Sequence, residues 1–104
     1  MKKYIFSIGL NDKDTKLQII ETALALSIIS KEVAEAFWGG TIYEASGVFS
    51  HNDKSIVQEK TIRVETLDFI NDNNVFVDFA KKIRDKFNQE SILMEVVDIP
   101  CQFI

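Results

Sequence analysis

Six segments of the chain show a clear apolar periodicity, and their order along the sequence leaves few folds open. Alternating apolar side chains predict strands, whereas apolar side chains that recur every three or four residues predict amphipathic helices. The sequence predicts a strand at residues 3–10, a helix that ends before Gly39-Gly40, strands at 41–50 and 56–68, a helix at 76–87 and a strand at 92–97. This order is that of the split β-α-β, ferredoxin-like pattern.

Each predicted helix has a single apolar stripe, so we expect both helices on one face of a four-stranded antiparallel sheet. The expected fold is therefore an α+β, ferredoxin-like βαββαβ domain that covers residues 1–104 and leaves the other face of the sheet open. The strands at 3–10 and 56–68 should be central. The predicted core consists of Phe6, Ile8, Ile29, Val33, Ile62, Val64, Phe79 and Ile83.

The start of the first helix stays open at this stage. Thr15 has Gln18 three residues later, which is the spacing of a capping box, and Thr22 is a second candidate for the N-cap.

The balance of charges argues against nucleic-acid binding. Lys and Arg number 12 against 16 Asp and Glu, for a net charge of −4, whereas domains that grip phosphates are usually basic. The one cysteine excludes a disulfide within the chain and a multi-cysteine zinc site. No apolar run approaches the ~18 residues of a membrane span, so we expect no membrane association and a cytoplasmic protein, in the host cytoplasm if a phage encodes it.

Residues that commonly carry catalysis or bind metals are few and poorly placed. His51 lies at a predicted hairpin tip, where a histidine is usually solvated, and Cys101 lacks a setting that would lower the pKa of its thiol. Asp12 and Asp14 resemble the start of a calcium loop, but the pattern then fails. The loop 9–16 is a minor candidate for an anion site. We therefore predict no catalytic residue, no metal and no cofactor.

The open face of the sheet is the most informative predicted surface. Strand parity places there the polar residues Ser7, Arg63, Glu65 and Glu95, with Glu44 and Ser46 if their strand has no bulge, among the apolar residues Ile5, Leu67, Leu93 and Val97. Such a mixed face is typical of a subunit interface or a pocket. Arg63 can bind a carboxylate or phosphate in a bidentate manner. The alternative is a cross-strand ion pair of Arg63 with Glu65 or Glu95.

Trp38 and Tyr43 flank the glycine pair at a predicted strand end. Their rings could stack on the ring of a ligand, and the alternative is that they belong to the core. The candidate ligand-binding residues are thus Ser7, Trp38, Tyr43, Glu44, Arg63, Glu65 and Glu95.

Three stretches of the sequence carry a resemblance to known proteins. They are SIGLNDKDTKLQ at residues 7–18, the segment Gly39–Phe49 with the later VQEKTIRVETL, and FNQESILMEVVDI at residues 87–99. In these stretches the chain resembles small uncharacterised proteins of phages, prophages and Firmicutes genomes. The resemblance implies a phage context and a ferredoxin-like fold, and it brings no catalytic motif. Small oligomeric phage proteins are often anti-defence factors, some of which sequester nucleotide signals of bacterial immunity.

Three functional hypotheses follow. The first is a non-enzymatic, homo-oligomeric binding protein, dimeric or larger, that sequesters a nucleotide-like signal or binds a host defence protein. The second is a small-ligand regulator resembling the PII or CutA type, although the long exposed loop expected between the second and third strands is missing. The third is a small dimeric enzyme that works on the open face with Tyr43, Arg63 and Glu65.

Overall fold

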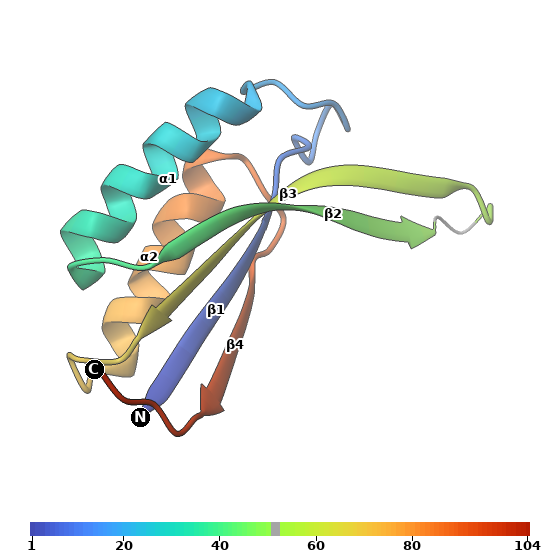
Figure 1. The fold of residues 1–104 in the computed structure, drawn as a ribbon. Helices are drawn as coiled ribbons and strands as arrows, with labels where there is room; N and C mark the ends of the chain where they lie inside the picture. The colour runs from blue at the N-terminus through green and yellow to red at the C-terminus, as the bar shows by residue number, and fades with distance from the viewer. Residues whose placement is uncertain (51–52) are drawn as a thin grey trace.

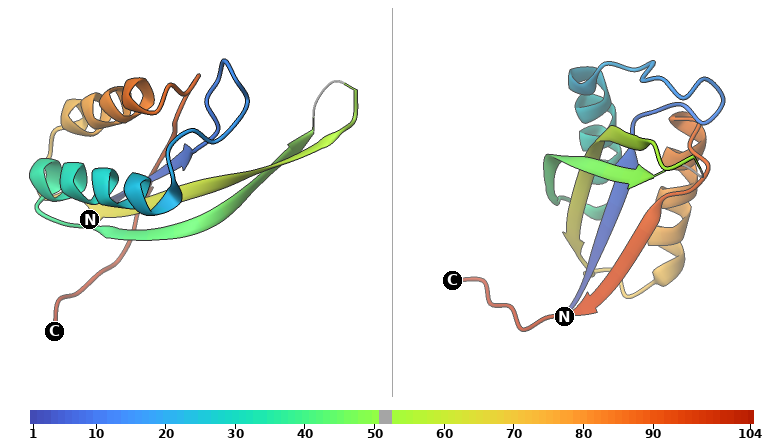
Figure 2. Two further views of the ribbon diagram at one scale, coloured as in Figure 1. Left: turned by 90° about the horizontal axis from the view of Figure 1, so that it is seen from above. Right: turned by 90° about the vertical axis from the view of Figure 1, so that its right-hand side faces the viewer.

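The computed structural model describes residues 1–50 and 53–104, and these form one four-stranded sheet with two helices. In chain order the elements are β1 (Lys2–Gly9), α1 (Thr22–Phe37), β2 (Thr41–Ser50), β3 (Ile56–Leu67), α2 (Asn73–Lys86) and β4 (Leu93–Asp98). The strand order in the sheet is β2-β3-β1-β4, and all neighbouring strands are antiparallel. Both helices lie on the same side of the sheet, as Figures 1 and 2 show. The prediction of an α+β, ferredoxin-like fold is confirmed.

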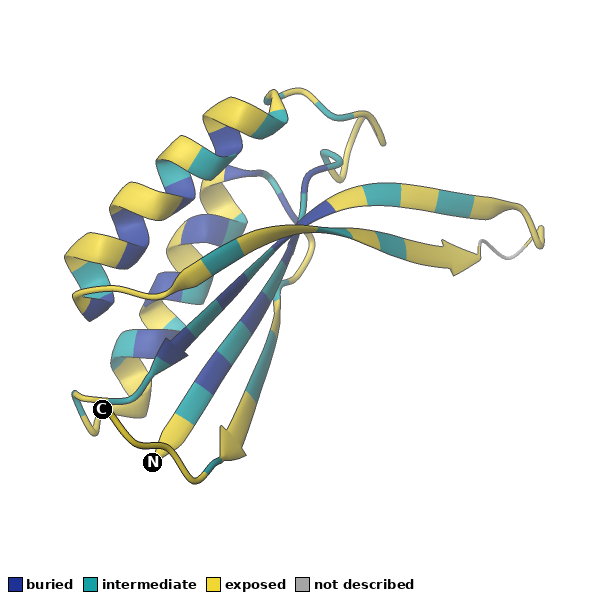
Figure 3. Ribbon diagram, viewed as in Figure 1, coloured by how far each residue is buried: buried dark blue, intermediate teal, exposed yellow. Residues whose placement is uncertain are grey.

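The register of the two central strands, β1 and β3, sends one set of side chains toward the helices. Phe6 lies opposite Val64 and Ile8 lies opposite Ile62, and all four side chains are fully buried. The alternation of buried and half-buried positions along β1 is visible in Figure 3. All eight residues of the predicted core are buried, so the predicted register is confirmed.

Aromatic rings join the helices to the sheet. The ring of Phe37 at the end of α1 stacks on that of Phe76 in α2, with centroids 4.8 Å apart, and Phe6 of β1 meets Phe79 edge-on at 4.9 Å. Tyr4 stacks on Phe76, and its hydroxyl donates a hydrogen bond to Asn73 Oδ1 at 2.9 Å. These contacts fix the first turn of α2 over the middle of the sheet, because a buried tyrosine hydroxyl needs a polar partner.

Helix α1 begins at Thr22 and not near Thr15, but its N-cap is Glu21, so neither threonine is the N-cap that the sequence predicts. The carboxylate of Asp12 accepts hydrogen bonds from the amides of Asp14 and Thr15, at 2.9 and 3.0 Å. Lys16 then adopts a positive φ of 64°, which a helix cannot contain. Residues 12–16 therefore form a closed turn instead of a first helical turn. The helix ends as predicted, with Trp38 in the left-handed region directly before Gly39.

The hairpin of β2 and β3 extends beyond the rest of the sheet. Gly9 pairs with Thr61 in the last pairing between β1 and β3, and the Leu10 amide after it still donates to the Lys60 carbonyl, so residues 56–59 of β3 pair only with β2. This projecting part is visible in Figure 1, and it explains why the molecule measures 47 Å in one direction and 25 Å in the other two. The predicted hairpin joint includes His51, which lies outside the described residues.

Candidate functional site

Arg63 lies at the centre of a polar group on the open face. It occupies a cross-strand row with Tyr43 of β2 on one side and Ser7 of β1 on the other. Its Nη1 donates hydrogen bonds to Ser7 Oγ at 2.5 Å and to Glu95 Oε1 of β4 at 3.1 Å. The Tyr43 hydroxyl and Glu95 raise the pKa of the guanidinium, so the charge of Arg63 is held by residues from all three other strands.

Glu65 is the second centre of this group, one row further along β3. Its Oε2 accepts a hydrogen bond from the Tyr43 hydroxyl at 2.6 Å, and its Oε1 forms an ion pair with Lys3. Lys3 and then Tyr43 lower the pKa of the Glu65 carboxyl, because both stabilise the ionised form. We call Lys3, Ser7, Tyr43, Arg63, Glu65 and Glu95 the open-face cluster.

The open-face cluster carries two positive and two negative charges. Lys3 forms an ion pair with Glu65, and Arg63 forms one with Glu95. Of the two cross-strand partners predicted for Arg63, Glu65 and Glu95, the structure therefore has Glu95 as the ion-pair partner. Apolar side chains surround these charges: Ile5 and Leu67 are half-buried, while Leu93 and Val97 are exposed. The surface thus offers both signs of charge in a partly dehydrated setting, which suits a small ligand that carries both signs itself.

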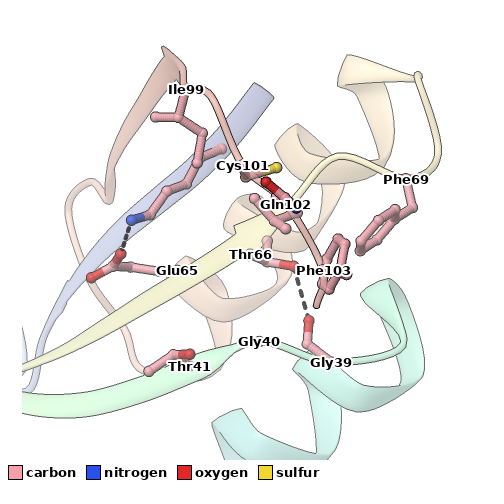
Figure 4. Close-up of a pocket in the computed structure, with 12 residues that line it drawn as sticks. Gly39, Gly40, Thr41, Glu65, Thr66, Phe69, Ile99, Cys101, Gln102 and Phe103 are labelled. Atoms are coloured by element: carbon pink, nitrogen blue, oxygen red, sulfur yellow. Dashed lines mark hydrogen bonds and ion pairs between the residues drawn. The ribbon is translucent and has the colours of Figure 1, made fainter. Parts of the chain in front are cut away.

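A cavity of about 490 Å³ adjoins the open-face cluster. Its walls are the segment Gly39–Thr41, the end of β3, Phe69 and the chain from Ile99 to Phe103, and the ion pair of Lys3 with Glu65 belongs to both cavity and cluster (Figure 4). The volume is in the range of small-ligand sites. Sequence reasoning missed this cavity, although the apolar tail Phe103-Ile104 was a visible signal.

Two of the predicted ligand-binding residues, Glu44 and Trp38, lie outside the open-face cluster. The pairing of β2 with β3 is continuous from Thr41 to Ser50, without a bulge, and Glu44 lies opposite the buried Ile62. Glu44 and Ser46 therefore point to the helix side of the sheet, because adjacent residues of a strand alternate between faces. The placement of Glu44 with Tyr43 on the open face is wrong.

Trp38 differs from one of its two interpretations, the core residue, while its stacking on a ligand ring stays a prediction. Its side chain is 79% exposed at the end of α1, so it is not a core residue. The residues that line the cavity include its neighbours Gly39 and Gly40 but not Trp38. The structure thus brings together Ser7, Tyr43, Arg63, Glu65 and Glu95, and leaves Trp38 and Glu44 outside.

In the loop after β1, the carboxylates of Asp12 and Asp14 accept hydrogen bonds from other residues of the chain. Asn88, directly after α2, donates to Asp12 Oδ1 at 2.7 Å and to Asp14 Oδ2 at 2.9 Å. Hydrogen bonds from Thr15 and Asn88 lower the pKa of Asp12. Within residues 1–50 and 53–104, no three His, Cys, Asp or Glu side chains converge as metal ligands would. Cys101 is an exposed thiol.

Comparisons with known proteins find the fold but no family. No model of a protein family and no curated protein matches the sequence. A phage SAM lyase in complex with S-methyl-5'-thioadenosine has a similar structure, with a TM-score of 0.71 and 15% identity over 93% of this chain and 80% of that chain. The apo form of a phage SAM lyase has a TM-score of 0.66 and 16% identity, over 92% of this chain and 78% of that one.

A third similar structure is the divalent ion tolerance protein CutA1 from Ehrlichia chaffeensis. Its TM-score is 0.56 and its identity 13%, over 97% of this chain and 84% of that chain. The predicted likeness to phage proteins and to the CutA type thus holds at the level of fold. No helix within the described ranges is long and apolar enough to cross a membrane.

The prediction that the chain is not an enzyme is contradicted by these comparisons. That prediction rests on the lack of a histidine, cysteine or metal constellation in the sequence. The fold is shared with a phage SAM lyase, which is an enzyme, so the likeness points toward an enzyme and away from a chain without turnover.

Proposed function

We propose that the chain binds S-adenosylmethionine, or a close sulfonium relative, at the open-face cluster and cleaves a carbon–sulfur bond of it. S-methyl-5'-thioadenosine is the part of S-adenosylmethionine that remains when sulfur loses its bond to the amino-acid portion. The observation that supports the proposal is the polar group in which Arg63 interacts with Ser7, Tyr43 and Glu95, on a fold shared with a SAM lyase.

The charges of the cluster match this substrate. S-adenosylmethionine has a carboxylate, an ammonium group and a positive sulfonium, and it has ribose hydroxyls that need acceptors. Arg63 offers a planar fork of donors for the carboxylate, while Glu95 and Glu65 offer acceptors for the positive groups and the hydroxyls. A polyphosphate would meet both carboxylates, so the cluster favours a ligand with both signs of charge.

The chemistry requires little from the protein beyond position and exclusion of water. As the carbon–sulfur bond breaks, its electron pair passes to sulfur and the positive charge there disappears. The carbon that leaves sulfur forms its new bond with an oxygen of the fragment's own carboxylate, so the four-carbon fragment closes to a lactone and no proton has to be removed. A partly apolar site favours the loss of charge, and half-buried Ile5 and Leu67 supply such surroundings.

The test compares two arginine variants of the full chain. S-adenosylmethionine is incubated with the purified protein, and S-methyl-5'-thioadenosine is measured by chromatography. We expect Arg63→Ala to lose at least tenfold in kcat/KM, or ~1.4 kcal/mol of transition-state stabilisation. Arg84→Ala is the matched control, because Arg84 lies on α2 and pairs with its neighbour Asp85. No release of S-methyl-5'-thioadenosine by the wild type contradicts the proposal.

The same pair of variants addresses the proposed anti-defence role. An enzyme of this kind would act on a host by consuming its methyl donor instead of sequestering a signal. Expression of the wild type or Arg84→Ala in bacteria should lower the cellular S-adenosylmethionine concentration, and expression of Arg63→Ala should leave it unchanged.

A further inference from the structure

We propose that the cavity beside the open-face cluster holds the adenine ring of the substrate, and that Phe103 of the C-terminal tail covers this ring. The inference rests on the proposed function, since it assigns the nucleoside end of the same ligand. It concerns a region that carries no charge of its own beyond the shared ion pair of Lys3 with Glu65.

Two exposed phenyl rings form one wall of the cavity. Phe69, after β3, and Phe103 have ring centroids 5.9 Å apart at an interplanar angle of 39°. The side chains are 51% and 73% exposed, although both are large and apolar. A planar ring placed against them would bury this surface and stack on an aromatic face, which stabilises a complex more than burial alone.

The segment Gly39–Thr41 forms another part of the cavity wall, and two of its three residues are glycines. A Cβ atom on Gly40 would lie 2.9 Å from the Glu65 carbonyl oxygen and 3.1 Å from Val33 Cγ1, so only glycine fits there. Gly39 has φ +155°, and its carbonyl oxygen accepts a hydrogen bond from Thr66 Oγ1 at 2.9 Å. Gly40 thus lets the chain pass close to β3 and α1, whereas nothing lies within 4 Å of a Cβ atom built on Gly39, so at that residue a flat ligand can approach the backbone closely.

The cavity and the open-face cluster form one continuous site. In Figure 4 the side chain of Glu65 stands at the edge of the cavity, with the tail residues across from it. The same carboxylate accepts the hydrogen bond from Tyr43 in the cluster. From Arg63 to Leu67 the strand spans ~13 Å at ~3.3 Å per residue. A nucleoside with an amino-acid chain therefore fits with its base in the cavity, its ribose at Glu65 and its carboxylate at Arg63.

The tail gives the cavity its cover. Ile99 is fastened to the first residue of the chain, since its amide donates to the Met1 carbonyl at 2.9 Å. From there the chain leaves β4, passes the end of β1 and reaches Phe69 beside β3, as Figures 1 and 4 show. Phe103 thus lies beside the cavity four residues after this hydrogen bond, against the ring of Phe69.

The experiment measures two ligands on three variants of the full chain. Calorimetry gives the Kd for S-methyl-5'-thioadenosine, which lacks the amino-acid portion, and steady-state kinetics give the KM for S-adenosylmethionine. Phe103→Ala should weaken S-methyl-5'-thioadenosine binding at least tenfold and raise the KM. Arg63→Ala should raise the KM and leave the Kd for S-methyl-5'-thioadenosine within about twofold of wild type. Trp38→Ala, an exposed aromatic outside the cavity, should change neither value.

The outcomes separate the two proposals. If the wild type binds neither ligand, both the proposed function and this inference fail. If the wild type binds S-methyl-5'-thioadenosine and Phe103→Ala binds it equally well, the proposed function stands and the adenine ring is not under the tail. Loss of binding in Trp38→Ala, with Phe103→Ala unaffected, also overturns the inference in favour of stacking on Trp38. Thermal melting of each variant confirms that the fold is intact.

Discussion

At the residue scale, Glu32 is the most constrained charged side chain on the helix side of the molecule. It is 9% exposed, and its two carboxylate oxygens meet Lys82 Nζ at 2.7 Å and Lys86 Nζ at 3.2 Å. These contacts join α1 to α2, and the hydrogen bond from Lys82 is the main reason that the pKa of Glu32 is lowered. The pair of helices is thus held by a carboxylate that must stay ionised.

Glu32→Gln should therefore destabilise the protein in a pH-dependent way. At pH 7 we expect a loss of ~1 kcal/mol in the free energy of unfolding, since both lysines are largely solvated. A folded-state pKa below the unfolded value, ~4.3, means that the stabilisation is present above that pH and disappears as the pH falls through the folded-state pKa. Urea unfolding of wild type and variant from pH 7 to pH 3 measures the difference. An exposed carboxylate on the same helix, changed in Glu35→Gln, is the control, and a constant difference across this range contradicts the prediction.

At the element scale, the end of α2 anchors the long connection between β1 and α1. Asn88 has φ 48°, and its side chain donates to both Asp12 and Asp14. Gln89 adds a hydrogen bond from Nε2 to the Asn11 carbonyl at 2.7 Å. Three bonds from two adjacent residues thus hold a connection that has little apolar packing of its own.

We expect Asn88→Ala to loosen this connection without unfolding the domain. The free energy of unfolding should fall by ~1–2 kcal/mol, and amide hydrogen exchange should accelerate in residues 11–17. Asn71→Ala is a matched control, because Asn71 also has a positive φ, at 58°, but lies before α2. Equal effects of the two changes would mean that the cost comes from the backbone conformation and not from the bonds to Asp12 and Asp14.

At the scale of the whole molecule, exposed large apolar side chains lie on the edge strand β4, on the projecting hairpin and on the tail. Leu93 is 57% exposed on the edge strand β4, and Phe103 and Ile104 end the chain in solvent. Burying such side chains is worth roughly 1.5–3 kcal/mol each when complete. We propose that a second copy of the chain covers part of this apolar surface, so that the protein is a homo-oligomer.

Sedimentation velocity at micromolar concentration should give a mass of at least twice the 11.9 kDa of one chain. Leu93→Glu should shift the protein toward the monomer, because a charge would enter the apolar interface. Leu24→Glu places the same charge at a position on α1 that is 55% exposed, and it should leave the mass unchanged. A wild-type monomer at this concentration contradicts the proposal.

The order of the elements, the two central strands, the side chains that they turn toward the helices and the core were predictable because periodicity is a local property of the sequence. Phe6, Ile8, Ile62 and Val64 had to face the same layer once their strands were recognised. The alternation of side chains along a strand also implies that Glu44 and Tyr43 point to opposite faces of the sheet. Tyr43 lies beside Arg63 on the open face, so the expectation that Glu44 lies on that face too was wrong. The start of α1 was not predictable, because the bonds that close residues 12–16 come partly from Asn88.

The cavity was decided by the tertiary structure alone. Lys3, Gly40, Glu65 and Phe103 come from four parts of the chain, and no local pattern records that the tail crosses to Phe69. Sequence patterns report which side of an element is apolar, because each side chain's direction follows from its own backbone. They do not report where a segment without periodicity comes to rest, since that depends on surfaces that exist only once the sheet and helices have packed.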